Sequence, residues 1–420
     1  MEDIMKQKLF SKDFTLVVIG QIISLFGNAV IRFALPLYLL NQTGSSALYG
    51  TVTACAFIPA ILLSPVGGIV ADRVNKRNIM VLLDFFTATV ILVFSLFVGK
   101  GNLILPVTLT LMLLYGIAGA YQPAVQASVP ALVSQENFVA ANSVINMISS
   151  FSALLGPVLG GILYSVYGLK AVLRVCIVCF LLSAVMEIFI KISFDRRETK
   201  GGMWKTVKED FAESIKFIRK EKPVIGKGVL MVCGINLFLS AMIIVSLPYM
   251  VTEVFSFPSD MANKLYGFAQ GALAAGGLAG GIGVGIFARR LTIQKSGKLI
   301  IVCAACVFPM GLAPMIFSSE WINYIVMTLC CFAIMVFSTI FTVQMMSFVQ
   351  TQTPQELIGK VIAVILTVSM CAQPLGNALY GVLFEICKGF EGVVILFAGA
   401  ASLVIAVRGG KIFQEISLPG

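Results

Sequence analysis

Histidine is absent from this sequence, and charged residues make up only 12% of its 420 residues. Histidine is the side chain whose unperturbed pKa lies nearest to neutral pH, so proton chemistry in this chain has to rely on carboxyl groups. A soluble domain contains about 25% charged residues. The shortage of charge, together with a hydrophobic share of 58%, indicates a protein that crosses a membrane many times.

The sequence also lacks the motifs that enzymes and metal sites use. Without histidine no HExxH zinc motif is possible, and no phosphate-binding loop is present. Cys176 with Cys179, and Cys303 with Cys306, have CxxC spacing; we interpret them as helix-packing residues, with a metal or redox pair as the alternative. The glycine-rich stretch 276–285 lies in an apolar run, which favours close helix packing over dinucleotide binding. The sequence therefore predicts no cofactor, no metal site and no enzymatic activity.

Apolar runs of about 20 residues, the length that spans a bilayer as a helix, recur along the whole chain. The sequence predicts an all-α polytopic membrane protein with twelve transmembrane helices, which we place at 14–40, 47–71, 78–98, 104–127, 138–164, 171–193, 224–251, 263–288, 298–317, 322–349, 358–386 and 393–408.

Lysine and arginine gather on one side of these spans. The other side carries only Lys100, Lys170, Lys264 and Lys388. The positive-inside rule makes the basic side cytoplasmic and places both termini in the cytoplasm of a multi-pass cell-membrane protein. The net charge of +10 therefore reflects topology in the lipid bilayer, and we expect no nucleic-acid partner.

A polar stretch divides the spans into two groups of six. We predict an N-terminal six-helix bundle at 1–193, a cytoplasmic linker at 194–223 and a C-terminal six-helix bundle at 224–420. Within the linker, apolar residues at spacings of three and four alternate with basic ones, which predicts an amphipathic helix on the inner membrane surface. The alternative is a helix for a calmodulin-like partner.

The two halves repeat. "LFGNAVIRFALPLY" at 25–38 aligns without gaps with "LFLSAMIIVSLPYM" at 237–250, and "VQASVPAL" at 125–132 resembles "VQTQTPQEL" at 349–357. Six spans separate the members of each pair. This spacing indicates parallel repeats related by an axis along the membrane normal.

The loop between the second and third spans reads Gly68-Ile-Val-Ala-Asp72-Arg73-Val-Asn-Lys76-Arg77. This resembles the signature of the major facilitator superfamily, and the resemblance extends over nearly the whole chain. The residues before and within the eleventh span, including "QPLGN" at 373–377, look like the branch of macrolide-efflux and siderophore-exporter proteins. The resemblance implies the major facilitator fold, transport by alternating access, and a protein that works as a monomer.

Physical reasoning about that loop suggests a cytoplasmic gate. Gly68 permits close helix approach, and Asp72 suits the positive N-terminal end of a neighbouring helix. Arg73, Lys76 and Arg77 can pair with acidic groups, although an ordinary positive-inside loop also explains Lys76 and Arg77. For Asp84 we prefer a partner of the gate arginine over a proton carrier.

A second motif lies in the fifth span. Gly156-Pro157 and Gly160-Gly161 are similar to the end of the antiporter motif of drug exporters in the superfamily. Ser149 and Ser152 stand where that motif has its earlier glycines, so the direction of transport follows less firmly than the fold.

Polar residues form stripes on several spans, and polar groups facing lipid are costly. In this superfamily spans 1, 4, 7 and 10 border a central cavity. We expect a cavity lined by Gln21, Asn28, Arg32, Gln122, Gln126, Asn146, Asn236, Ser240, Gln344, Gln373 and Asn377. Each Asn or Gln has an interhelical hydrogen bond as its alternative role, and Arg32 has a headgroup or a backbone carbonyl. Glu187, near the end of the sixth span, is expected to reach the membrane interface.

These features predict a secondary-active transporter that exports drug-like or amphipathic small molecules. Proton coupling is what the resemblance implies. The alternatives are a specific carrier of a siderophore, a lysolipid or a nutrient, and a membrane sensor that does not transport.

Overall fold

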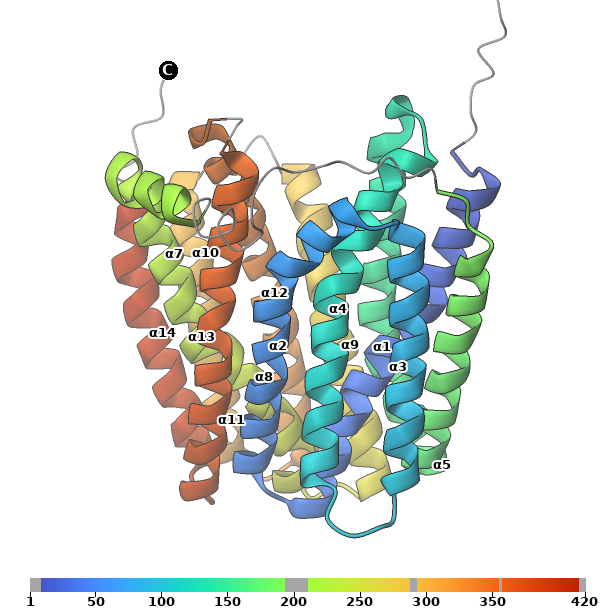
Figure 1. Ribbon diagram of the computed structural model, residues 1–420. Helices are drawn as coiled ribbons and strands as arrows, with labels where there is room; N and C mark the ends of the chain where they lie inside the picture. The colour runs from blue at the N-terminus through green and yellow to red at the C-terminus, as the bar shows by residue number, and fades with distance from the viewer. Residues whose placement is uncertain (1–8, 193–210, 288–292, 355–356, 415–420) are drawn as a thin grey trace, which may run out of the picture. The chain divides into compact units, whose positions relative to one another are not determined.

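The computed structural model describes residues 9–192, 211–287, 293–354 and 357–414. Every regular element in these ranges is helical (Figure 1). Eleven helices are long and apolar enough to cross a membrane, and one of them, Ala140–Ile188, has the length of two spans. The predicted all-α architecture with twelve spans is therefore confirmed.

The first half of the chain contains five long helices. They are α1 (Lys12–Thr43), α2 (Ser46–Arg73), α3 (Lys76–Phe97), α4 (Ile104–Leu132) and α5 (Phe138–Ile188), with the short 3₁₀ helix η1 (Gln135–Asn137) before α5. Gly168 breaks α5 with φ of 73° and ψ of 178°. This backbone conformation favours glycine, and it separates the two predicted spans within α5.

The second half contains the remaining helices. They are η2 (Phe217–Glu221), α7 (Pro223–Ile235), η3 (Asn236–Ser240), α8 (Ala241–Tyr249), η4 (Met250–Val254), α9 (Ser259–Phe287), α10 (Ile293–Ala305), α11 (Val307–Ile316), α12 (Glu320–Gln352), α13 (Ile358–Ile386) and α14 (Glu391–Gln414). The run from α7 to η4 is continuous and forms one span, in which η3 and η4 are π-helical turns. Of the predicted amphipathic linker helix, residues 211–216 are helical, and the part before residue 211 lies outside the described residues.

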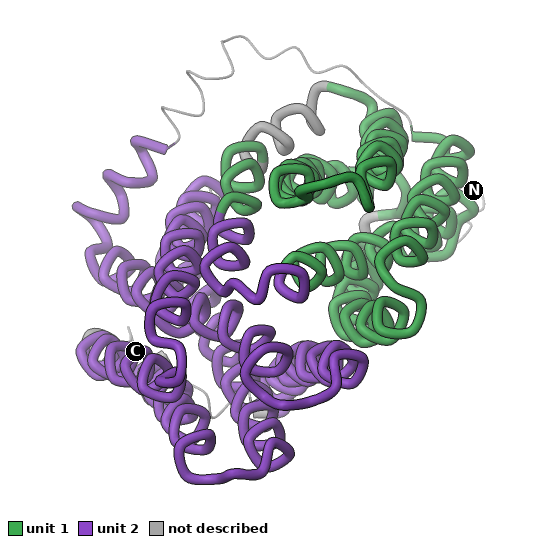
Figure 2. Tube along the Cα trace, turned by 90° about the horizontal axis from the view of Figure 1, so that it is seen from below, with its two compact units in different colours: residues 1–39, 55–200 green, residues 40–54, 201–420 purple. Residues whose placement is uncertain are grey.

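Contacts along the chain define two compact units (Figure 2). One comprises residues 1–39 and 55–200, and the other comprises residues 40–54 and 201–420. Residues 40–54 join the second unit because they pack closely on α13. The Ser46 hydroxyl donates to the carbonyl of Gly381 at 3.0 Å, and a side chain on Gly50 would collide with the backbone of α13. The predicted domain boundaries and the linker role of 194–223 stay predictions.

The first unit has an apolar core that surrounds its polar groups. In it α3 packs against both α4 and α5. Buried residues of α1, α3, α4 and α5, among them Phe14, Met80, Ala124 and Ala141, form one cluster with Ile190, which follows α5. Within a membrane, no hydrophobic driving force brings helices together, so they associate through close packing. Small residues permit this close approach. Gly20 and Gly27 of α1 provide this fit against the second part of α5.

Candidate functional site: a buried carboxyl network

Six polar side chains are buried inside the first unit, where α1, α3, α4 and α5 meet. None of them is more than 5% exposed. They are Gln21 and Ser24 of α1, Asp84 of α3, Tyr121 of α4, and Ser183 and Glu187 of α5. Buried polar groups are costly unless they are hydrogen-bonded, so such a group within an apolar span is a candidate for a functional site.

Hydrogen bonds connect these side chains across the four helices. The Tyr121 hydroxyl donates to Glu187 Oε1 at 2.6 Å and accepts from Gln21 Nε2 at 2.7 Å. The Ser24 hydroxyl donates to Asp84 Oδ1 at 3.0 Å, and the Ser183 hydroxyl donates to the backbone carbonyl of Gly20 at 3.0 Å. Asp84 and Glu187 are close enough to interact electrostatically. The six residues form one network, which we call the carboxyl network.

Helical spacing brings these residues to common faces. Gln21 and Ser24 are three residues apart on α1, and Ser183 and Glu187 are four apart on α5, so each pair shares a side of its helix. Gly20 lets the two helices approach, because a Cβ there would lie 3.4 Å from Ser183 Oγ and 3.5 Å from Glu187 Cγ. The contact thus brings the Glu187 side chain directly against α1.

The network corrects one expectation from the sequence and leaves another untested. Asp84 bonds to Ser24, whereas the guanidinium of Arg77 donates to the backbone carbonyl of Ile188. The side chain of Arg73 lies outside the described residues, so a pairing of Asp84 with a gate arginine stays a prediction. Glu187 does not reach an interface, since it is 1% exposed and hydrogen-bonded to Tyr121. Helical periodicity shows which residues share a face, but it does not show that α4 supplies a partner for α5.

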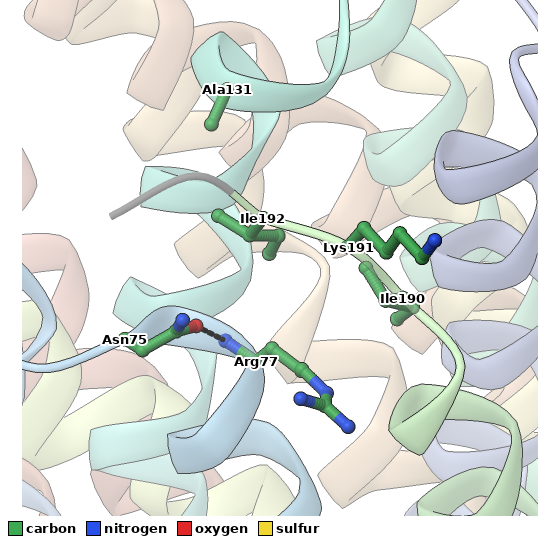
Figure 3. A pocket seen from close by; sticks show the side chains of 6 residues that line it. All are labelled: Asn75, Arg77, Ala131, Ile190, Lys191 and Ile192. Atoms are coloured by element: carbon green, nitrogen blue, oxygen red, sulfur yellow. Dashed lines mark hydrogen bonds between the residues drawn. The ribbon is translucent and has the colours of Figure 1, made fainter. Parts of the chain in front are cut away.

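The predicted gate extends from the end of α2 to the start of α3, and Asp84 lies farther along α3. The backbone conformation of residues 64–73, which include Gly68, is helical, but the side chains of Asp72 and Arg73 lie outside the described residues. Asn75 caps α3 by accepting a hydrogen bond from the backbone N–H of Arg77 at 3.0 Å (Figure 3). Asn75 and Arg77 line a cavity of about 480 Å³, together with Ala131, Ile190, Lys191 and Ile192. Lys76 is partly exposed at the same helix end.

Arg32 lies between α1 and α4. Its Nη2 donates to the carbonyl of Leu114 at 3.0 Å, and its guanidinium carbon lies 3.8 Å from the centre of the Tyr115 ring. The Tyr115 ring in turn lies 5.2 Å from that of Phe57. Arg32 Nε has no hydrogen-bond partner. The structure therefore shows the backbone contact that is the alternative role of Arg32, together with a cation–π contact beside two aromatic rings. Its place in a substrate cavity stays a prediction.

The second unit holds its own polar side chains. Asn236 donates to the carbonyl of Ser369 at 2.9 Å and accepts from Ser240 at 3.2 Å, which matches the alternative role of an interhelical bond. Asn377 is fully buried, and neither atom of its amide has a partner. Gln344 and Gln373 are half-buried.

The remaining predicted residues belong to the first unit. Asn28 and Gln122 are half-buried, and Gln126 and Asn146 are exposed. Their place in a shared cavity stays a prediction. In the antiporter-like motif, Gly156 and Gly160 face Ala29 and Phe33 of α1, while Pro157 continues the same helix and Gly161 is buried. This motif therefore fixes the packing of α5 on α1.

Comparison with known proteins identifies the family. A family model described as Major Facilitator Superfamily matches residues 17–377, which is most of the chain. The chain belongs to the major facilitator superfamily. It is 24% identical over 369 residues to macrolide efflux protein A of Streptococcus pyogenes, covering 86% of both chains. It is 22% identical over 381 residues to the multidrug efflux pump Tap of Mycobacterium tuberculosis, covering 88% of this chain and 86% of Tap.

Solved structures of major facilitator transporters share the fold. A D-xylose–proton symporter matches with a TM-score of 0.71 at 13% identity, covering 94% of this chain and 96% of that one. A bacterial homologue of the lysosomal transporter Spinster matches with a TM-score of 0.69 at 14% identity, covering 96% and 97%. Family membership and the apolar helices make this chain a multi-pass membrane transporter.

Sequence reasoning did not single out two members of the carboxyl network in this major facilitator protein. Ser183 and Tyr121 lie on predicted spans, where one hydroxyl among apolar residues carries no signal of its own. Only the arrangement of four helices shows that Tyr121 joins Gln21 to Glu187.

Proposed function

We propose that this transporter is a secondary-active exporter of drug-like or amphipathic small molecules, driven by exchange for protons through alternating access. The observation that carries the proposal is the similarity to macrolide efflux protein A over 86% of both chains. The similarity to the efflux pump Tap points to the same class of substrate.

The first unit contains groups suited to such substrates. Arg32, Tyr115 and Phe57 bring one cation together with two aromatic rings. Aromatic faces bind apolar bodies, whereas a guanidinium binds carbonyl or anionic groups, so the set suits molecules that carry both. The chain also has 31 phenylalanines and 18 methionines, and flexible Met-rich surfaces can repack around different ligands.

The direction of transport rests on the proposed topology. The basic loops and both termini face the cytoplasm, and the gate at 68–77 closes the cytoplasmic mouth in one state of the cycle. Labelling of single cysteines at Lys100 and Arg290, in a background without the other cysteines, tests this topology. Arg290 is expected to be accessible from the cytoplasm and Lys100 from outside.

Transport itself is tested with purified protein in liposomes that enclose a pH-sensitive dye. Macrolides, cationic dyes, siderophores and lysolipids are added one at a time, with protein-free liposomes and a proton ionophore as controls. We expect proton movement that depends on macrolides or cationic dyes and that the ionophore abolishes. Movement with a single siderophore or lysolipid would indicate a specific carrier. Absence of transport for the whole panel would contradict the proposed function.

A further inference from the structure

We propose that Asp84 and Glu187 together form the site at which this protein binds and releases a proton. Both carboxyl groups are buried in the carboxyl network, at 2% and 1% exposure, although they lie on different helices. Their role in coupling rests on the proposed function above. Their ability to bind a proton does not, and it can be measured without a substrate.

The network is short of hydrogen-bond donors. Gln21 Oε1, Asp84 Oδ2 and Glu187 Oε2 are buried without a partner, and all three are acceptors. An ionised carboxylate can only accept hydrogen bonds, whereas a protonated carboxyl group also donates one. Addition of a proton to Oδ2 or Oε2 would supply the missing donor. The geometry thus favours a proton on at least one of the two carboxyl groups.

Among the described residues, no positively charged side chain forms an ion pair with the carboxyl group of Asp84 or Glu187 and so takes the place of that proton. From α1 and α5 the facing groups are Gln21, Ser24 and Ser183, and from α4 the facing group is Tyr121. At the ends of these helices, Arg77 and Asp13 bind backbone groups of Ile188 and Lys191. Two carboxylates in an apolar bundle without a counterion are strongly unfavourable, which a mobile proton relieves.

The chemical step is a simple acid–base exchange. A proton from water adds to the unpartnered oxygen of one carboxylate and forms an O–H bond, and the same bond breaks when the proton returns to water. The cavity of about 480 Å³ beside Arg77 offers a place from which water can approach, since Ile190, which lines it, follows Glu187 by three residues. No oxidant, reductant or metal takes part.

The position of the pair also connects it to the gate. Arg77 belongs to the loop motif, and its guanidinium binds the carbonyl of Ile188, the residue next to Glu187. A change in the charge of Glu187 therefore occurs next to the Arg77–Ile188 hydrogen bond, which holds the start of α3. Through this contact, proton binding would bias the gate toward one of its states.

Infrared difference spectroscopy tests proton binding directly. Spectra of the purified protein in lipid nanodiscs are recorded between acidic and alkaline buffer for the parent, Asp84→Asn, Glu187→Gln and the double variant. Glu136→Gln, which removes an exposed acid of the same unit, is the matched control. We expect a carboxyl band in the parent and control that changes with pH, exchanges slowly with deuterium, weakens in each single variant and disappears in the double variant. A slowly exchanging band that survives in the double variant, or a parent without a pH-dependent buried band, would overturn the proposal.

Transport measurements then test coupling. Once a substrate is known, Asp84→Asn and Glu187→Gln should lose most substrate-dependent proton movement but retain exchange of labelled for unlabelled substrate, which needs no net proton transfer. Proton-driven transport at the parent rate in both variants would show that the pair does not couple. Failure of the parent to transport anything would instead count against the proposed function and leave the infrared result to decide proton binding.

Discussion

Gly156 of α5 lies so close to Ala29 of α1 that a methyl group on Gly156 would overlap the Ala29 side chain. In the second unit, Gly376 of α13 meets Ala241 of α8 in the same way. Ala29 and Ala241 occupy equivalent positions in the internal sequence repeat. Both halves therefore use one small-residue contact to join the first helix of the half to its fifth span.

Gly156→Ala should lower stability by about 1–3 kcal/mol, the usual cost of forcing an extra methyl group into a packed contact. Apart from Ala29 Cβ, its nearest neighbours lie at an ordinary 3.4 Å, so the double variant Ala29→Gly, Gly156→Ala should regain most of the loss. Thermal unfolding in detergent measures both, with Gly281→Ala as control because no atom lies within 4 Å of its added methyl group. Equal stability of Gly156→Ala and the parent would contradict this contact.

In the second unit, the corresponding pair of substitutions, Gly376→Ala with Ala241→Gly, should not restore most of the lost stability. A methyl group on Gly376 would collide with the backbone carbonyl oxygen of Leu237 as well as with the side chain of Ala241. A substitution can remove the Ala241 methyl group but not the Leu237 oxygen. Gly376→Ala should therefore lower the unfolding temperature, and Ala241→Gly should restore only a small part of it. Full rescue would show that the Leu237 carbonyl moves freely.

The sequence predicted the parts of this structure that depend on periodicity and composition. Long apolar runs located the spans, and the predicted boundary between the fifth span, 138–164, and the sixth, 171–193, contains the break at Gly168. The alignment of Ala29 with Ala241 predicted a repeat that the glycine contacts reproduce.

The carboxyl network was beyond this reasoning because its contacts link residues far apart in sequence. Tyr121 and Glu187 are 66 positions apart, and Gln21 and Tyr121 are 100 apart. Arg77, two helical turns before Asp84, looked like a natural partner, yet its guanidinium binds a backbone carbonyl. Local spacing gives the possible partners, and helix packing selects among them.

Tyr121→Phe tests the strongest hydrogen bond of the network. Loss of the hydroxyl leaves Glu187 Oε1 and Gln21 Nε2 buried without their partner, which should lower stability by about 1–3 kcal/mol. The loss should be larger in alkaline buffer, where more carboxyl groups are ionised and the missing bond is the charge-assisted kind. Thermal unfolding across pH measures it, with Tyr167→Phe as the control, since Tyr167 is 70% exposed. A loss that is the same at every pH would indicate that Glu187 does not change its protonation state over this range.

Asp72→Asn tests the gate motif. The substitution keeps the shape of the side chain but removes the charge that suits a helix N-terminus. We expect normal membrane insertion and strongly reduced transport, measured at matched protein levels beside Glu136→Gln. Transport near the parent rate would show that the loop serves topology alone.

Arg32 offers the sharpest test of how substrate is recognised. An arginine near the centre of a membrane helix costs about 2.5–3.5 kcal/mol on insertion scales, so Arg32→Leu should insert at least as well as the parent. The repeat supports this, because the position equivalent to Arg32 is Ile244. Leucine removes the hydrogen bond to the Leu114 carbonyl and the stacking on Tyr115.

If Arg32 and Tyr115 act together on substrate, Arg32→Leu and Tyr115→Leu should each change the substrate range in the same way. The double variant should then differ little from either single variant. Arg32→Lys, which keeps the charge but not the planar group, should lie between the parent and Arg32→Leu. The measurement is the transport rate of each of the four variants, compared with the parent, for every substrate that the parent transports. Unchanged rates and pH dependence in Arg32→Leu would limit Arg32 to its contact with the Leu114 carbonyl.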